Sequence, residues 1–201
     1  MKISYGKNVY GAEEINSVVS QLKKTTQMGA SVNKFEALIA KKFSKKYGLM
    51  VNSGSSALTL AMSVLGVNRN DEIIVPCLNF GTAISSIIQA GAKPILVDVE
   101  VDTLQIDVSE IEKKITNKTV AIMVPNLIGN IPDLKKIKII ATKHNLRVVE
   151  DSADTLGARI GNKTTGFYSD ISITSFYGSH VISCAGNGGM FLTNNKKFYE
   201  K

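Results

Sequence analysis

The alternation of short apolar runs with helical patterns, regular from Asp71 onward, is the feature that most constrains the fold of this 201-residue chain. Each run is continuously apolar, so its side chains need cover on both faces of a sheet. Strands separated by helices indicate parallel pairing, with helices on both sides of the sheet. We therefore predict an α/β protein with three α/β/α layers and a seven-stranded, mostly parallel sheet. Its strands are expected at residues 49–52, 73–75, 94–97, 120–124, 147–150, 171–174 and 190–193.

Helical spacing of apolar residues accounts for the segments between and before these strands. In residues 31–46, Phe35 and Ile39 recur at helical intervals, and Ser31 is the expected N-cap. Asp133 is expected to cap a later helix. The other helices are expected at residues 12–24, 57–65, 82–89, 108–115 and 133–144.

The net charge of +7 is carried by lysine pairs that are spread along the predicted helices, such as Lys41 and Lys42. Such pairs favour solvated helix faces over a nucleic-acid surface, which needs clustered positive charge and interleaved aromatic residues. The two cysteines, Cys77 and Cys184, lack the number and spacing of a disulfide framework or a metal site. We find no run long enough to span a bilayer and no signal-peptide pattern, and we expect a cytoplasmic protein.

Ligands of such a sheet bind beyond the carboxyl ends of its strands. The sequence places there a small-residue turn that can hold a phosphate, an aromatic residue, carboxylates and a histidine. Neither a glycine-rich dinucleotide fingerprint nor a Walker lysine is present. The candidate residues are Ser53 to Ser55, Asn79 and Phe80, residues 126–130, Asp151 and Asp154, and Ser175 to His180.

The turn from Ser53 to Ser55 separates a predicted strand from an apolar helix. Free N–H groups and the helix dipole converge at such a helix start, and Gly54 lets an anion approach closely. An N-cap formed by Ser55 or Ser56 explains the same turn without a ligand. The turn alone leaves the two interpretations open.

His180 lies in a polar turn at the exit of the sixth predicted strand and is one of only two histidines. An imidazole with a pKa of about 6.5 moves protons at neutral pH, and loops at strand ends commonly carry function. The alternative is a histidine that only bonds to its own turn. We expect the other histidine, His144, at the surface, and Cys184 to be a structural thiol because no base or cation neighbours it in the sequence.

These residues resemble, in order and spacing, the DegT/DnrJ/EryC1/StrS family of PLP-dependent enzymes of fold type I, over nearly the whole chain. The resemblance implies that Gly54, Ser55 and Ser175 hold the cofactor phosphate. It also implies that Phe80 stacks on the pyridine ring and that Asp151 pairs with the ring nitrogen. A buried carboxylate keeps that nitrogen protonated, which the cofactor needs as an electron sink. The structural alternative for Asp151 is an aspartate that caps the following turn.

Most members of the family are aminotransferases with the pattern Ser-Phe-X-X-X-Lys, whose lysine holds the cofactor covalently. Here the sixth position is His180, and no lysine lies between Lys163 and Lys196. Imidazole forms no stable Schiff base but can move a proton, so transamination through a tethered lysine is disfavoured. The same substitution marks the 4-keto-6-deoxy-sugar 3-dehydratase branch, which the chain also resembles at residues 127–130 and at the cofactor-site residue Asp154.

The resemblance implies a PLP/PMP-dependent dehydratase of a nucleotide-linked 4-keto-6-deoxy sugar, in deoxysugar and lipopolysaccharide biosynthesis. In that role His180 takes a proton from the C4′ methylene of the cofactor and returns it to the departing C3 hydroxyl. The expected partners are the nucleotide sugar and a second copy of the chain, without nucleic acid, membrane or metal. The alternatives are a nucleotide-sugar aminotransferase relative that works without the lysine, and a non-catalytic fragment.

The His180 loop departs from the dehydratase branch at Gly178 and Ser179, where Pro-Ala is usual, and it is one residue longer before Gly188. The family pattern divides the chain into an N-terminal arm and helix, residues 1–30, and a PLP-binding large domain, residues 31–201. Because the family continues into a small C-terminal domain, we expect the chain to be truncated and that domain to be absent.

Overall fold

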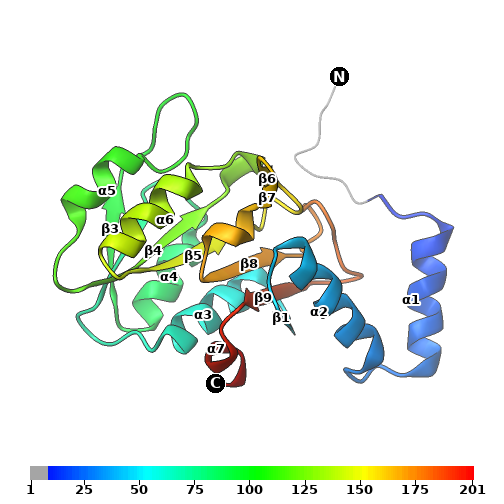
Figure 1. Cartoon of the computed structure of the whole chain (residues 1–201). Helices are drawn as coiled ribbons and strands as arrows, with labels where there is room; N and C mark the ends of the chain where they lie inside the picture. Colours follow the sequence, from blue (N-terminus) through cyan, green and yellow to red (C-terminus); the bar gives the residue numbers. More distant parts are fainter. Residues whose placement is uncertain (1–8) are drawn as a thin grey trace.

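The computed structural model describes residues 9–201, so residues 1–8 of the predicted arm lie outside the described part. A seven-stranded sheet forms the middle layer (Figure 1). Two short strands, β6 (Arg159–Ile160) and β7 (Lys163–Thr164), pair with each other outside this sheet. The strands of the sheet are β1 (Tyr47–Val51), β2 (Glu72–Pro76), β3 (Lys93–Val97), β4 (Thr119–Pro125), β5 (Arg147–Asp151), β8 (Ile171–Ser175) and β9 (Gly189–Thr193).

The strands lie in the order β1-β9-β8-β5-β4-β2-β3. All neighbours from β8 to β3 are parallel, whereas β9 runs antiparallel to both β8 and β1. The predicted seven-stranded, mostly parallel sheet is therefore confirmed. The chain moves outward from β2 to β3 and then returns to β4 on the other side of β2. Sheets of this type open a crevice for ligands at such a reversal.

Helices occupy all the segments where helical spacing predicted them. Asp133 caps the sixth helix as predicted, because its carboxylate accepts a hydrogen bond from the Lys136 N–H (3.0 Å). Two short 3₁₀ turns, η1 (Leu127–Gly129) and η2 (Thr165–Tyr168), follow β4 and precede β8. The helices are α1 (Ala12–Lys24), α2 (Ala30–Lys42), α3 (Gly54–Leu65), α4 (Gly81–Gln89), α5 (Val108–Lys114), α6 (Leu134–Lys143) and α7 (Lys196–Glu200).

Both ends of α2 differ from the prediction. The helix begins after Gly29, and the predicted N-cap Ser31 lies inside it, where its hydroxyl donates to Gln21 Oε1 (3.1 Å). It ends at Lys42 rather than at residue 46, because Ser44 takes a left-handed backbone conformation with φ of 54°. A left-handed residue cannot continue a right-handed helix, and the apolar spacing carries no signal of it.

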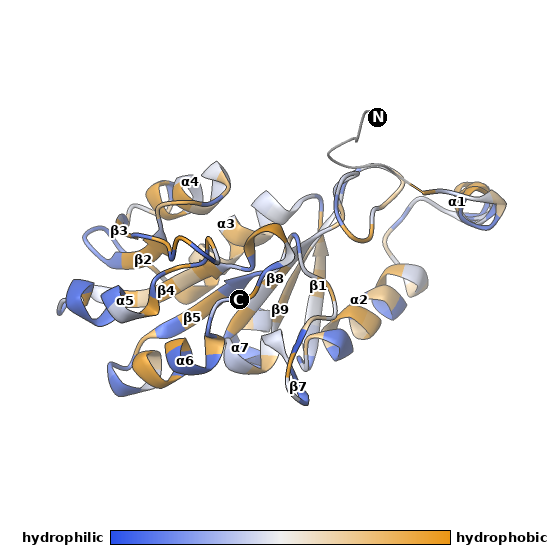
Figure 2. Ribbon diagram, turned by 90° about the horizontal axis from the view of Figure 1, so that it is seen from above, coloured by the Kyte–Doolittle hydropathy of each residue, from blue (hydrophilic) through white to orange (hydrophobic). Residues whose placement is uncertain are grey.

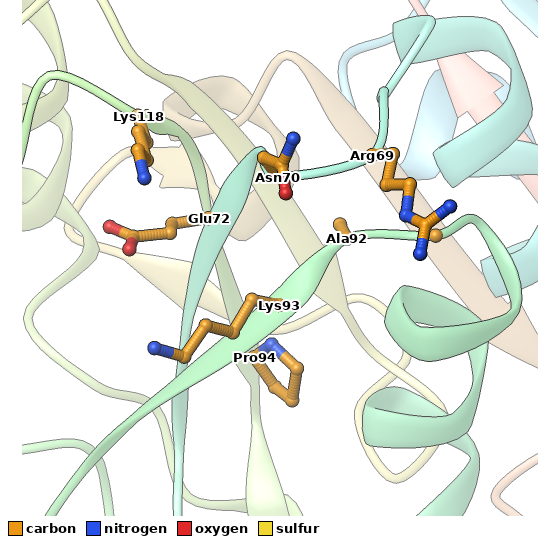
Figure 3. Close-up of a pocket in the computed structure, with 8 residues that line it drawn as sticks. Arg69, Asn70, Glu72, Ala92, Lys93, Pro94 and Lys118 are labelled. Carbon is orange, nitrogen blue, oxygen red and sulfur yellow. The ribbon is translucent and has the colours of Figure 1, made fainter.

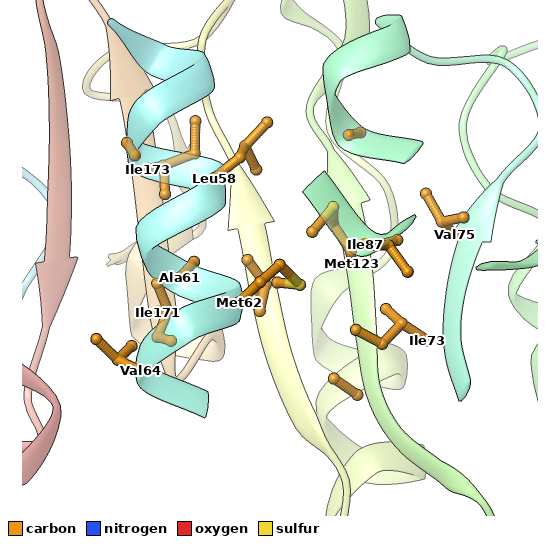
Figure 4. Packing of buried hydrophobic residues seen from close by; sticks show 14 of the residues in the cluster. Leu58, Ala61, Met62, Val64, Ile73, Val75, Ile87, Met123, Ile171 and Ile173 are labelled. Carbon is orange, nitrogen blue, oxygen red and sulfur yellow. The ribbon is translucent and has the colours of Figure 1, made fainter. Parts of the chain in front are cut away.

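Alternate residues of the central strands face opposite helix layers, which explains why these strands are apolar throughout. On β2, Ile73 and Val75 pack with α3 and α4, whereas Ile74 packs with α5 and α6. Figure 2 shows these two helix layers on opposite sides of the sheet. In the first cluster Leu58 of α3 lies beside Ile173 of β8 (Figure 4). Each such fully buried aliphatic side chain contributes roughly 1.5–3 kcal/mol.

A third apolar cluster joins α2 to the antiparallel end of the sheet, where Phe43 packs with Phe176 and Met190. Helix α1 takes no part in any core and contributes no buried residue. It lies to the side of the sheet, joined to α2 by a short connection (Figures 1 and 2). Among residues 9–201, no helix has the length and apolarity needed to cross a membrane.

Candidate functional site

The carboxyl ends of β2, β4, β5 and β8 and the start of α3 surround a cavity of about 600 Å³. The sequence placed its candidate residues at this edge of the sheet, and the structure brings them together in one cavity. Asn126, Tyr177 and Ser179 also line the cavity; the sequence included them only within candidate segments and gave them no individual role. The predicted residues that line it are Gly54, Ser55, Phe80, Asp151, Asp154, Ser175 and His180.

The start of α3 presents two backbone amides that the helix itself does not use. Ser53 is the N-cap: its hydroxyl accepts from Ser56 N–H (3.1 Å), and its carbonyl accepts from Ala57 N–H (3.1 Å). The alternative that Ser55 or Ser56 caps this helix is therefore wrong. The amides of Gly54 and Ser55 precede the first intrahelical bond, at the positive end of the helix dipole, where an anion is stabilised.

Two glycines allow three chain segments to meet at this turn. A Cβ on Gly54 would meet the Cβ of Ser175 at 2.9 Å, so the end of β8 lies directly against the start of α3. A Cβ on Gly189, at the start of β9, would overlap the carbonyl of Ser53. The glycines thus let β9 pass behind the turn, and the Ser175 hydroxyl lies 3.3 Å from the position that a Cβ on Gly54 would take.

Asp151 ends β5 and is the buried carboxylate of the cavity, with 8% of its surface exposed. Burial raises the pKa of this carboxyl to about 6, against the Ala153 N–H, which lowers it, and with the nearby Asp154 and Glu150 carboxylates raising it further. Asp151 Oδ1 accepts from that Ala153 N–H (3.0 Å), so the turn-capping alternative is part of its role. A cation in the cavity would stabilise the charged form.

The imidazole of His180 lies beside the carboxylate of Asp154, with 3.7 Å between Nε2 and Oδ1. This distance is too long for a hydrogen bond and lies within the range of an ion pair. Only the backbone N–H of His180 bonds to the turn, through Tyr177 O (2.9 Å). The histidine thus bonds to its turn through the backbone, while its imidazole makes no hydrogen bond to the turn. The Nδ1 atom is buried and has no partner among residues 9–201.

The turn after β4 holds Asp154 in place from behind. Ile128, with a left-handed φ of 58°, donates its backbone N–H to Asp154 Oδ2 (3.0 Å). The buried side chain of Gln105 fixes this turn, because it donates to Leu127 O (3.1 Å) and accepts from Leu127 N–H (3.4 Å). A left-handed β-branched residue is strained and is kept only where its surroundings hold it.

Phe80 precedes α4 and leaves 72% of its surface exposed where it lines the cavity. An exposed aromatic face is apolar surface that a planar ligand can cover. Asn126, at the other extreme, is 1% exposed. Sequence reasoning included it only as part of a polar segment after β4, and its position directly after a buried strand was the available signal.

His144 and Cys184, for which the sequence predicted no catalytic role, are not among the residues that line the cavity. His144, at the end of α6, contacts Glu112 on the surface through Nε2 (2.8 Å). Cys184 is half-buried, and burial raises the pKa of its thiol, which makes it a poor nucleophile. A smaller pocket of about 340 Å³ lies at the opposite edge of the sheet, where Arg69, Lys93 and Lys118 surround it (Figure 3).

Residues 9–201 match the sequence model of the DegT/DnrJ/EryC1/StrS aminotransferase family. The chain belongs to this family. The resemblance seen in the sequence is thus confirmed.

The names of relatives in this family differ in the activity they state. GDP-perosamine synthase of Escherichia coli O157:H7 is 41% identical over 173 residues, which are 86% of this chain and 47% of that protein. GDP-4-keto-6-deoxy-D-mannose 3-dehydratase of Escherichia coli O55:H7 is 32% identical over 179 residues, 86% of this chain and 46% of that protein. The chain therefore spans about half the length of the curated relatives it matches.

A solved structure of a protein named as a 3-dehydratase supports the fold assignment. The E. coli GDP-4-keto-6-deoxy-D-mannose-3-dehydratase with bound hydrated PLP superposes with a TM-score of 0.93 and 29% sequence identity. The match covers 100% of this chain and 53% of that protein. The α/β fold with its seven-stranded, mostly parallel sheet matches that of PLP-dependent fold type I neighbours, as predicted.

Proposed function

We propose that this chain is the cofactor-binding part of a PLP/PMP-dependent enzyme that removes the C3 hydroxyl of a nucleotide-linked 4-keto-6-deoxy sugar. The observation that carries this proposal is the place of His180. It lines the cavity beside Asp154, at the position where the family's tethering lysine is expected, and none of the lining residues is a lysine. A base without a tether suits chemistry on the aminated cofactor rather than ordinary transamination.

The residues of the cavity fit the cofactor. The free amides of Gly54 and Ser55 and the Ser175 hydroxyl offer donors to a phosphate at a point where a Cβ on Gly54 would intrude. Asp151 is a buried carboxylate whose raised pKa indicates that it lacks a cationic partner, and a protonated ring nitrogen supplies one. Phe80 offers the exposed aromatic face against which a ring can stack.

When bound, PLP or PMP supplies an electron sink next to the carbon that loses a proton. His180 takes that proton at Nε2, because Nδ1 is buried, and holds it until it passes to the departing hydroxyl. Asp154 stabilises the charged imidazole across 3.7 Å and is itself held by the Ile128 N–H. Asp151 keeps the ring nitrogen protonated while these transfers occur.

The first test is cofactor binding to this 201-residue chain. We expect added PLP or PMP to change in absorbance on binding and to raise the melting temperature of the chain, since a ligand that binds only the folded state stabilises it. The domain division at residues 30 and 31 belongs to the same proposal, with residues 31–201 as the binding part. No change with either cofactor would leave the alternative of a non-catalytic fragment.

The second test is the His180→Asn variant, assayed with a nucleotide-linked 4-keto-6-deoxy sugar. We expect C3–O cleavage to fall by at least about 10²-fold, since general acid–base groups contribute roughly 10²–10⁴-fold. PMP binding should change little. His180→Lys should in contrast allow PLP to become covalently held, which borohydride reduction and mass spectrometry detect. Undiminished dehydration by His180→Asn would remove His180 from this role.

The second candidate function is a nucleotide-sugar aminotransferase that works without the lysine, and the 41% identity to a GDP-perosamine synthase favours it. The product decides between the two candidates. A dehydratase yields a 3-deoxy-4-keto sugar and no aminated sugar, whereas a transaminase yields an amino sugar. We further propose that the protein works as a homodimer in the cytoplasm.

A further inference from the structure

Ile128, in the turn after β4, has a strained backbone that packing does not explain. Among residues 9–201 it is the only β-branched residue with a left-handed backbone conformation. Its side chain is 69% exposed, so burial of apolar surface does not offset this strain. The conformation does bring its N–H to Asp154 Oδ2 (3.0 Å). A strained residue that is held in place at the edge of a cavity indicates a functional requirement for its geometry.

The hydrogen bonds that hold this turn come from the loop between β3 and α5, residues 98–107. The side chain of Gln105 is 3% exposed, and it binds both the O and the N–H of Leu127, at 3.1 and 3.4 Å. On the other side of the turn, Asn130 Nδ2 donates to Thr103 O (2.9 Å). Both ends of the turn are therefore tied to the same loop.

This loop is anchored independently of the cavity. Val99 and Ile106 form an antiparallel bridge across its base, and Glu100 N–H donates to Gln105 O (2.9 Å). Ile106 is buried in the apolar cluster beneath α5 and α6. Gln105 itself is not among the residues that line the cavity. Its amide is thus fixed from the core and acts on the turn from behind.

The turn in turn fixes the carboxylate that faces the imidazole. Within residues 9–201, the carboxylate of Asp154 accepts one hydrogen bond, from the Ile128 N–H to Oδ2. Its other oxygen, Oδ1, lies 3.7 Å from His180 Nε2. Because the two oxygens belong to one planar group, the donor at Oδ2 determines where Oδ1 points.

On the basis of the proposed function, we propose that Gln105 is a positioning residue for the proton transfers of His180. It acts through the turn at residues 127–129 and the carboxylate of Asp154. Without the two hydrogen bonds of Gln105, Ile128 relaxes to a right-handed backbone conformation and its N–H leaves Asp154. The carboxylate is then free to turn away from the imidazole, whereas the groups proposed to bind the cofactor keep their places.

The test observes the imidazole directly, in the chain without cofactor. The chain has only two histidines, so an NMR spectrum of the ring nitrogens contains two sets of signals. His144, which contacts Glu112 on the surface, is the internal control. Asp154→Asn gives the displacement of the His180 signals when the carboxylate is lost. We expect Gln105→Met, which keeps the length of the side chain but has no amide, to move them in the same direction and to leave those of His144 in place.

Ile128→Gly separates positioning from packing. Glycine adopts the left-handed conformation without strain, so adding this change to Gln105→Met should return the His180 signals toward those of the parent chain. A packing defect at Gln105 would not be repaired in this way. Thr193→Val is the matched control, because it removes a buried hydroxyl that donates to Asp170 O (3.0 Å) at the opposite end of β8 from the cavity. We expect it to leave the His180 signals unchanged.

The second readout is kinetic. With PMP and a nucleotide-linked 4-keto-6-deoxy sugar, we expect Gln105→Met to lower kcat about tenfold, the effect of one lost hydrogen bond in the transition state. KM and the affinity for PMP should not change, because the lost contact acts on proton transfer and not on binding.

His180 signals that stay in place in folded Gln105→Met, or that move equally in Thr193→Val, would overturn this inference. So would Asp154→Asn without effect on them, or Ile128→Gly without rescue. If Gln105→Met does not fold, Asn130→Ala removes the exposed tie to Thr103 and should move the signals in the same direction, and no movement would overturn the inference. If the parent chain binds neither PLP nor PMP, the proposed function fails, while the ring signals still decide whether Gln105 orients Asp154 toward His180.

Discussion

Asp151 makes the stability of the chain depend on pH. Burial raises the pKa of its carboxyl from 3.8 to about 6, so the folded chain holds this proton more tightly than the unfolded chain does. The stabilisation from Asp151 is therefore fully present below pH 3.8 and is lost as the pH rises through 6. Above pH 6 the charged carboxylate, which has no cationic partner among residues 9–201, destabilises the fold.

Asp151→Asn should consequently stabilise the chain in the absence of cofactor. The amide never ionises and can still accept from Ala153 N–H, so we expect a gain of roughly 1–3 kcal/mol at pH 7.5 that disappears near pH 4. Urea unfolding at the two pH values measures it. The exposed Asp102→Asn should change stability by less than about 0.5 kcal/mol at either pH. A variant less stable than the parent at pH 7.5 would show that the raised pKa is wrong. PLP affinity should fall in Asp151→Asn.

The candidate site residues were predictable because each lies at the end of an apolar run or in the loop that follows it. Asp151 and His180 were found in this way, and both line the cavity. The hydrogen bonding of the Asn126 side chain could not be predicted in this way, because it depends on the Glu150 carboxylate, 24 residues away on the neighbouring strand. Local sequence contains no record of which way an amide is turned by such a partner.

At the scale of elements, the close approach of β9 to the start of α3 shapes the turn from Ser53 to Ser55. Gly189→Ala would drive a Cβ into the Ser53 carbonyl and the Gly54 amide. We expect a loss of at least about 2 kcal/mol of stability, since backbone cannot give way as a flexible side chain does. PLP affinity should fall with it, because the turn that presents the amides has to shift.

Gly81→Ala is the matched control for this variant, as Gly81 begins α4 beside Phe80 and a Cβ there meets nothing within 4 Å. We expect neutral or slightly increased stability, since alanine favours helix. Thermal unfolding and PLP titration of both variants provide the comparison. Equal stability of Gly189→Ala and the parent chain would mean that β9 and the turn are not in contact.

Element positions were predictable from apolar spacing, whereas element ends depended on single residues. The helix α3 begins three residues before the predicted Ala57, because Ser53 supplies the cap and the small residues after it continue the helix. Small polar residues at such a boundary suit the cap and the first turn alike, so composition cannot choose between them. Ser44 ended α2 for a comparable local reason.

For the whole molecule, continuous apolar runs sufficed to predict the layers and the number of strands in the sheet. They did not reveal that β9 is antiparallel, because a strand buried on both faces has the same pattern in either direction. The strand order, and with it the cavity at the reversal between β2 and β4, likewise follows from contacts distant in sequence.

Helix α1 is the part of the molecule that its own core does not stabilise. Four of its apolar residues follow helical spacing on one face, and all are exposed: Ile15, Val18, Val19 and Leu22. A helix of 13 residues is marginal by itself in water. Tyr10, just before it, bonds to Ser183 Oγ (3.0 Å) and Cys184 O (3.2 Å), which connects this helix to the loop of His180.

We expect this face of α1 to be covered by a second copy of the chain, so that dimer formation and the site are linked. Ile15→Glu with Leu22→Glu should convert a dimer to a monomer in sedimentation equilibrium, since two carboxylates cannot be buried in an apolar contact. Glu13→Gln, on the polar side of the same helix, should leave the dimer intact. PMP affinity should fall in the double variant as the arm beside the His180 loop loosens. A parent chain that is monomeric at high micromolar concentration, or a double variant that stays dimeric, would show that α1 is not the contact.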